Sequence, residues 1–152
     1  MRRLILAVVA VAALAVPAAT LAGSGGSDNG TMCVLNTQLR PENEVPMSTS
    51  TAKGHTQIKV RNDGTIEYKT HINNPNGETF VAGHIHLAPA GSPGPIVQSL
   101  FFPGPNSDRN IKDSGAVSNP ALGTALCTTP SAYYVNYHTT TNPTGAIRGQ
   151  LG

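Results

Sequence analysis

The sequence predicts an all-β protein, an antiparallel Greek-key β-sandwich or barrel of the superoxide-dismutase-like or immunoglobulin-like kind. Short apolar runs with partial alternation recur at spacings of about 10–15 residues, and Gly, Pro, Asn and Asp separate them. No stretch has the length and periodicity of a substantial amphipathic helix. The 16 glycines, 12 prolines and only 12% charged residues likewise disfavour a helical bundle or coiled coil.

The expected strands follow one another along the chain at 33–39, 49–60, 65–72, 79–87, 96–102, 131–139 and 146–151, and an eighth is left open. Asp63-Gly64 between the second and third strands is a strong hairpin signal. A long polar loop is expected up to Ser114. One helical turn is predicted over 120–126.

The first 22 residues have the pattern of a secretory signal peptide. Arg2 and Arg3 precede the apolar run Leu4–Val16, and small residues lead to a predicted cleavage after Ala22. A retained anchor is the alternative, but the run is shorter than the ~20 residues of a membrane span, so no stable membrane insertion is expected after cleavage. Residues 23–31 are predicted to be a flexible linker and 32–152 the folded domain. The expected location is secreted, extracellular or periplasmic (cell envelope).

Cys33 and Cys127 are the chain's two cysteines, and in an exported protein such a pair predicts one disulfide. The bond would close a loop of about 94 residues and tie the first strand to a late one. The chain-entropy model gives such a closure roughly 4–5 kcal/mol. The alternative is a cysteine that serves as a soft metal ligand.

The net charge excludes one class of partner. The whole chain has a formal charge of +2, and removal of residues 1–22 takes away two arginines and leaves it near zero. A nucleic-acid binder would be expected to carry a basic patch or stripe, so no nucleic acid is predicted as a partner. An extracellular protein partner is left open.

Two strand segments carry the candidate site. Because side chains alternate faces along a strand, Val81, Ile85 and Leu87 should face the core, and His84 and His86 should share the opposite face. The same rule applied to the strand near the C-terminus puts Tyr133, Val135 and Tyr137 inside and Tyr134, Asn136 and His138 outside.

If these strands are neighbours, His84, His86 and His138 could bind one transition-metal ion, and neither Ca nor Mg suits nitrogen ligands. The affinity order favours copper, with zinc as an alternative. Hydrogen-bonded or solvated histidines are the competing interpretation. His55 or His71 would be a fourth ligand only if the fold brought it near.

Asn136 and Arg148 are the candidate supporting residues for that site. Asn136 could orient an imidazole. Arg148 could hold an anion, bind local carbonyls or pair with a carboxylate such as Glu44. No catalytic residue is predicted: the chain has no nucleophile elbow and no H-E-x-x-H motif, and Glu78 is the one carboxylate considered for a metal-bound water.

Several ordered sequence blocks resemble the CHRD domain, the module first named from chordin. The resemblance covers about 35–151. It rests on Asn43–Pro46, Ala82–His86, Gly94–Val97, Tyr134–Thr139 and Asn142–Leu151. The chain departs from the pattern at Tyr137, usually Val, and at Ala146, often Glu, which removes one partner for Arg148.

The resemblance implies a fold more than a function. The family brings no established enzymatic activity, and growth-factor binding by chordin is attributed mainly to other modules. The His-x-His strand is similar to the copper-ligand strand of copper–zinc superoxide dismutases, although a second, zinc-type cluster is missing. Such a likeness is a fold-level analogy.

Three functions follow as hypotheses. The first is a secreted CHRD-domain binding module with a surface three-histidine copper or zinc site. The second is a structural or adhesive envelope domain without metal. The third is a copper-dependent enzyme of superoxide-dismutase type. Whether the protein is an enzyme is left open, with a non-enzymatic role preferred.

Overall fold

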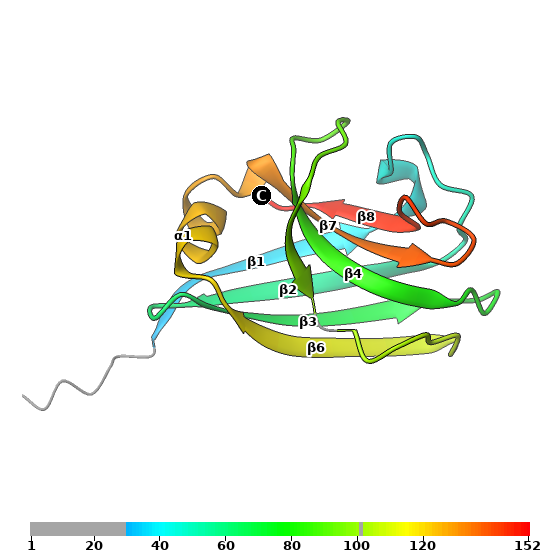
Figure 1. Cartoon of the computed structure of the whole chain (residues 1–152), viewed down its shortest axis with the longest axis horizontal. Coiled ribbons are helices and arrows are strands. Elements are labelled where there is room, and N and C mark those ends of the chain that lie inside the picture. Colours follow the sequence, from blue (N-terminus) through cyan, green and yellow to red (C-terminus); the bar gives the residue numbers. More distant parts are fainter. Residues whose placement is uncertain (1–29, 101) are drawn as a thin grey trace, which may run out of the picture.

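The structure is a computed structural model that describes residues 30–100 and 102–152. Within these residues, eight strands form two antiparallel sheets stacked as two layers (Figure 1). The first sheet contains β1 (Thr31–Leu39), β2 (Lys53–Arg61), β3 (Thr65–Asn73) and β6 (Asn110–Ser118), in that order. The second has the order β5 (Ile96–Leu100), β4 (Phe80–Leu87), β7 (Tyr133–Thr139) and β8 (Ile147–Gln150). The predicted all-β sandwich is confirmed.

The predicted signal peptide and linker residues 23–29 lie outside the described residues. β1 starts at Thr31, the last residue assigned to the linker. The helices in the described part are short, the longest having nine residues, and none combines the length and apolarity of a membrane span.

The core lies between the two sheets, where the inward side chains of both layers meet. Residues at every second position are buried along β2 and β3, as the period of two requires. Large, fully buried side chains come from both layers: Ile58, Ile66, Tyr68 and Ile72 from the first sheet, and Phe80, Ile85, Val135, Tyr137 and Ile147 from the second.

The prediction of a loop up to Ser114 is wrong, because β6 occupies residues Asn110–Ser118 and pairs with β3. Its inward positions include Asp113 and Gly115, which are poor strand formers. Asp113 accepts a hydrogen bond from Tyr137 of the other sheet, and Gly115 leaves room for the Tyr68 ring, whose hydroxyl would lie 2.6 Å from an added Cβ. Long-range contacts therefore override the local propensity of this segment.

The predicted inward face of β4 is right for Ile85 and wrong for Val81 and Leu87. Ile85 is fully buried, whereas Val81 is 37% exposed and Leu87 42% exposed. A register shift between Phe80 and Ala82 interrupts the alternation, and Leu87 ends the strand. The shift lets Phe80 reach the core in place of Val81.

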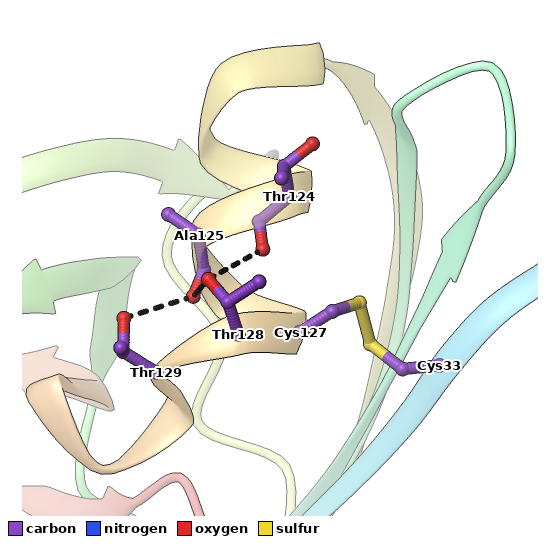
Figure 2. The surroundings of a disulfide bond; sticks show 6 residues. All are labelled: Cys33, Thr124, Ala125, Cys127, Thr128 and Thr129. Atoms are coloured by element: carbon purple, nitrogen blue, oxygen red, sulfur yellow. Dashed lines mark hydrogen bonds between the residues drawn. A yellow bond between two sulfur atoms is a disulfide. The ribbon is translucent and has the colours of Figure 1, made fainter.

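The predicted helical turn is a helix of nine residues, α1 (Pro120–Thr128). The side chain of Asn119 accepts a hydrogen bond from the Leu122 amide, and Pro120 occupies the first turn, where proline is tolerated. At the other end the hydroxyls of Thr128 and Thr129 donate to backbone carbonyls of the last turn, as Figure 2 shows.

Cys33 and Cys127 form the predicted disulfide (Figure 2). The bond joins β1 to α1 rather than one strand to another, so the expected strand-to-strand link is corrected. It closes a sequence separation of 94 residues. The alternative of a cysteine metal ligand is excluded, because both thiols are consumed.

Candidate metal centre

The two strands that carry the histidines are neighbours, as predicted. In the β4–β7 pairing, Ala82 lies opposite His138, His84 opposite Asn136 and His86 opposite Tyr134. His84 is therefore a diagonal neighbour of His138 on the same face of the sheet, within reach of long side chains. The pairing register brings together residues 54 positions apart in the chain.

The three imidazoles converge on one another. Nδ1 of His84 lies 2.8 Å from Nε2 of His138, and one nitrogen from each of the three rings falls within 4.8 Å of the other two. The centroid of the His84 ring is 4.7 Å from that of His138 and 5.7 Å from that of His86. The predicted grouping of the three rings is therefore present in the fold.

Two of the rings are fixed by backbone carbonyls. Nδ1 of His86 donates to the Gly94 carbonyl at 2.9 Å, and Nδ1 of His138 donates to the Pro143 carbonyl at 3.0 Å. When Nδ1 carries the proton, Nε2 of the same neutral ring keeps its lone pair. His86 and His138 thus each present an unprotonated Nε2.

The histidine group is less exposed than the expected surface site, because two of its rings are buried, while the His84 ring is half-buried. His86 is 7% exposed, His138 is 8% exposed and every residue of β7 is buried. The Pro143 carbonyl and the loop between β4 and β5, which supplies Gly94, contact the rings from outside the sheet. The inward assignment of Tyr133, Val135 and Tyr137 is confirmed by their places in the core.

Tyr134 and Arg148 hold the plane of the His86 ring. The Tyr134 ring stacks on His86 with an interplanar angle of 12° and a centroid distance of 4.7 Å. The Arg148 guanidinium lies 3.4 Å from the Tyr134 ring centroid and donates to the carbonyls of Pro89 and Ser92. Of the roles left open for Arg148, the bonds to local carbonyls are the ones observed.

Asn136 and Glu44 lie against the same group. Asn136 neighbours both His86 and Glu44: burial lowers the pKa of His86 and raises that of Glu44, and the Asn136 amide opposes both shifts. Glu44 directly follows the 3-10 helix η1 (Pro41–Asn43), which packs against β8. Burial raises the pKa of the Glu44 carboxyl to about 7, against the opposing effect of the Arg148 charge.

Three buried side-chain atoms in the described residues have no hydrogen-bond partner, and all three belong to this group. They are Nε2 of His86, Oδ1 of Asn136 and Oε1 of Glu44. Buried polar atoms are nearly always hydrogen-bonded, because their desolvation otherwise costs about 1–3 kcal/mol each. The Asn136 side chain lies beside both of the other residues, so the three atoms form one contiguous polar group.

The electrostatics of the site keep the imidazoles neutral. Burial, together with the neighbouring His138 and His86, lowers the pKa of His84 to about 4. Burial also lowers the pKa of His86 and of His138. The neutral ring is the form that ligates a metal, so at pH 7 the cluster is in its ligating state.

The residues considered as additional members lie elsewhere. His55 and His71 face each other across β2 and β3 of the first sheet, with ring centroids 5.6 Å apart. Glu78 accepts hydrogen bonds from the Ser50 hydroxyl, the Thr51 amide and the Asn142 side chain. None of these three residues belongs to the metal-ligand group found among the described residues.

Sequence reasoning missed the two residues that close the site, Tyr134 and Gly94. A tyrosine next to a core position carries no local sign of stacking on a histidine. Gly94 cannot be replaced easily, because an added Cβ would lie 2.1 Å from the Leu87 carbonyl oxygen. The Gly94-Pro95 pair in the family-like block was the one available signal.

Together, the fold and the site define a disulfide-linked β-sandwich with a covered histidine cluster on the outer side of one sheet. The chain belongs to the CHRD domain family, whose model matches residues 35–151. No match to the chain was found among curated proteins, and none among solved structures.

Proposed function

We propose that this protein is an extracellular or envelope CHRD-domain module that binds one transition-metal ion, copper or zinc, through His84, His86 and His138. The carrying observation is the convergence of the three rings on one point together with the partnerless, buried Nε2 of His86. A metal ion would satisfy that nitrogen and replace the His84–His138 hydrogen bond with two coordinate bonds.

The distances suit a shared ion after small ring rotations. Two nitrogens bonded to a tetrahedral metal at 2.0–2.1 Å lie about 3.3 Å apart. The nitrogens here are separated by between 2.8 Å and 4.8 Å, which brackets that value. Because Nε2 of His138 is unprotonated, the proton of the bond between the two rings sits on Nδ1 of His84. Metal binding through that nitrogen requires the neutral His84 ring to change tautomer, so that its proton moves to Nε2.

The carbonyl bonds of His86 and His138 support the proposal rather than the structural alternative. Metal-ligating histidines usually donate their other ring nitrogen to a carbonyl or carboxylate, which fixes the tautomer and orientation. Gly94 and Pro143 provide such acceptors. The remaining nitrogen of His86 is buried beside Asn136 and has no well-formed hydrogen bond, which supports a role as a ligand.

Asn136 and Arg148 are proposed to position the ligands. Asn136 lies beside His86, and Arg148 supports the Tyr134 ring on which His86 stacks. An all-nitrogen ligand set follows the divalent affinity order, which favours copper over zinc. The disulfide fits a location in an oxidising compartment outside the cytoplasm.

The test is metal titration of the purified protein with Cu(II) and with Zn(II), followed by elemental analysis after desalting. The expected result is one ion per chain, lost in the double variant His84→Ala/His86→Ala. The matched control is His55→Ala/His71→Ala, which also removes two neighbouring histidines but from the other sheet, and should bind as the parent does.

Absence of stoichiometric uptake would contradict the proposal and favour the structural or adhesive role. Equal losses in the two double variants would contradict it as well, because binding would then depend on histidine content rather than on this site. If copper binds, superoxide turnover by the loaded protein separates a simple binding module from a redox enzyme.

A further inference from the structure

The lysines of this protein are confined to one face of one sheet. Its four lysines, in the whole sequence, are Lys53, Lys59, Lys69 and Lys112. Lys59, Lys69 and Lys112 each lie between two buried residues of their strands, and Lys53 shares the alternation of Lys59 on β2, so all four project from the outer side of the first sheet. Arg61 of β2 shares this side. We call this surface the lysine face.

Strand register arranges three of these lysines in a diagonal stripe. Lys59 lies opposite Glu67, two positions before Lys69 on β3. Lys69 in turn lies opposite Ser114, two positions after Lys112 on β6. Diagonal neighbours on adjacent strands are about 7–8 Å apart. The stripe therefore crosses three strands with a regular spacing between the backbone positions of its lysines.

Acidic residues do not neutralise this face. Glu67 is its single carboxylate among the described residues, and it is already held by Arg61 at 2.8 Å and Lys59 at 3.9 Å. Asp113 of β6 points the other way and accepts a hydrogen bond from Tyr137. With four lysines and Arg61 against one carboxylate, the face keeps a net positive charge.

A hollow of about 310 Å³ opens on the same face. Its lining comprises His55, Lys69, Thr70, His71, Lys112, Asp113 and Ser114. The side chains of Thr70 and Asp113 are turned to the core, where both hydrogen-bond the Tyr137 hydroxyl. His71 lies between His55 and Lys112 in one cross-strand row, and Lys69 and Ser114 belong to the next row. The hollow thus offers two ammonium groups together with ring and hydroxyl hydrogen-bonding groups, which suits an anionic group.

We propose that the lysine face binds an anionic polysaccharide, a chain carrying repeated carboxylate or sulfate groups, with one such group seated in the hollow between Lys69 and Lys112. The proposal is independent of the histidine cluster, which belongs to the other sheet. A spaced row of cations matches a polymer whose charges recur along its length. It gives no comparable advantage to a single small anion.

The side-chain types favour this polymer over two other polyanions. β2, β3 and β6 carry no exposed large hydrophobic residue in the described structure, whereas Met32 and Val34 are exposed on the neighbouring strand β1, where Val34 lies opposite Lys59. These two side chains are a small apolar surface for insertion into a lipid membrane, compared with the row of lysines. Their one aromatic residue besides histidine, Tyr68, is buried, so nucleic-acid bases find no tyrosine or phenylalanine to stack on. Lysine is also a hydrated point charge without the bidentate geometry that arginine offers to phosphate.

The experiment measures binding of the purified protein to immobilised dextran sulfate and alginate, with neutral dextran as the uncharged control. Binding to both anionic polymers is expected at about 50 mM NaCl and should be lost near 0.5 M, where screening is several-fold stronger. The variant Lys69→Gln/Lys112→Gln should weaken binding about tenfold or more. The charge-matched control Arg40→Gln/Arg109→Gln removes two cations away from the lysine face and should have little effect.

Three results would overturn the proposal. One is no binding to either anionic polymer at low salt. Another is equal weakening in the two double variants, because net charge rather than this face would then be responsible. The third is tighter binding to phosphatidylglycerol vesicles or to single-stranded DNA than to the polysaccharides. Far-UV circular dichroism and the Tm of each variant establish that the fold is retained.

Discussion

Nδ1 of His84 and Nε2 of His138 lie 2.8 Å apart, although the two residues are separated by 54 positions in the sequence. β4 and β7 bring them together, and the His84 pKa is lowered to about 4 by burial and by the neighbouring rings. Two neutral imidazoles in this position can share one proton or one metal ion. If the rings share a metal ion, its binding should change the stability of the fold.

A metal ion bound by the cluster should stabilise the fold. Ligands that bind only the folded state raise the free energy of unfolding, by about 2.7 kcal/mol at a free concentration of 100 Kd. We expect Zn(II) to raise the Tm of the parent protein by several degrees, measured by calorimetry, and to leave the Tm of His138→Ala unchanged. A similar Tm increase in both proteins would place the binding elsewhere.

Arg148→Lys should weaken metal binding even though Arg148 is not proposed as a ligand. Lysine keeps the charge but loses the planar group that lies over Tyr134 and reaches two carbonyls. Loss of a group that orients a ligand typically costs 10–100-fold in metal affinity, and about tenfold is expected here. Isothermal titration calorimetry of the parent and the variant would measure this loss of metal affinity. Unchanged affinity with lower stability would leave Arg148 a purely structural role.

Glu44 should make stability depend on pH in a direction unusual for a carboxylate. Its pKa is 4.5 when unfolded and about 7 in the fold. Between these values the folded state retains a proton that the unfolded state has released. The contribution of Glu44 is therefore fully present below about pH 4.5 and is lost as the pH rises through about 7.

The variant Glu44→Gln isolates this effect, because glutamine stays neutral. The free energy of unfolding of the parent, minus that of the variant, should fall between pH 5 and pH 8 in urea titrations. The lowered pKa values of the three histidines act in the opposite direction, with stability lost as the pH falls, but they are common to both proteins. A difference that does not change with pH would contradict the prediction.

Tyr137→Phe should destabilise the protein by about 1–3 kcal/mol. The Tyr137 hydroxyl lies 2.8 Å from both the Asp113 carboxylate and the Thr70 hydroxyl, so it links the two sheets across the core. Its removal leaves a buried carboxylate without this donor. Thermal or urea unfolding measures the loss. The double variant Tyr137→Phe/Asp113→Asn should recover part of it, since no buried charge then remains.

Removal of the disulfide should cost about 2–5 kcal/mol in the free energy of unfolding. Cys33→Ser/Cys127→Ser frees α1 from β1 and opens a loop of 94 residues. Urea unfolding of the double variant, compared with the parent under non-reducing conditions, gives the value. If reductant destabilised the parent and the variant equally, the effect would not come from this bond.

The sequence predicted the sandwich and the face of each histidine because both depend on local alternation. A period of two along β7 assigns His138 and Asn136 to one side without any knowledge of neighbours. The same rule failed at Val81, where the register shift beside Phe80 moves the side chain to the opposite face. Such a shift depends on pairing with another strand and has no local signature here.

β6 shows the limit most clearly. Its inward residues include Asp113 and Gly115, which oppose a strand on propensity alone. Tyr137 donates a hydrogen bond to Asp113, and the Tyr68 ring occupies the space that a side chain at Gly115 would fill. These contacts make both residues favourable at inward positions of β6. Both tyrosines are remote from β6 in the sequence, so the strand conformation of this segment depends on contacts that form only in the packed core.

The amino-acid sequence by itself determined the fold class, the family-like blocks, the pair of cysteines and the side of the sheet on which the histidines lie, because these follow from residue type and local periodicity. The tertiary structure alone decided that the rings converge, that Gly94 and Pro143 cover them and that the lysines form a stripe. These properties depend on which distant strands pair and in what register. Packing of the whole core fixes that register, and no short segment encodes it.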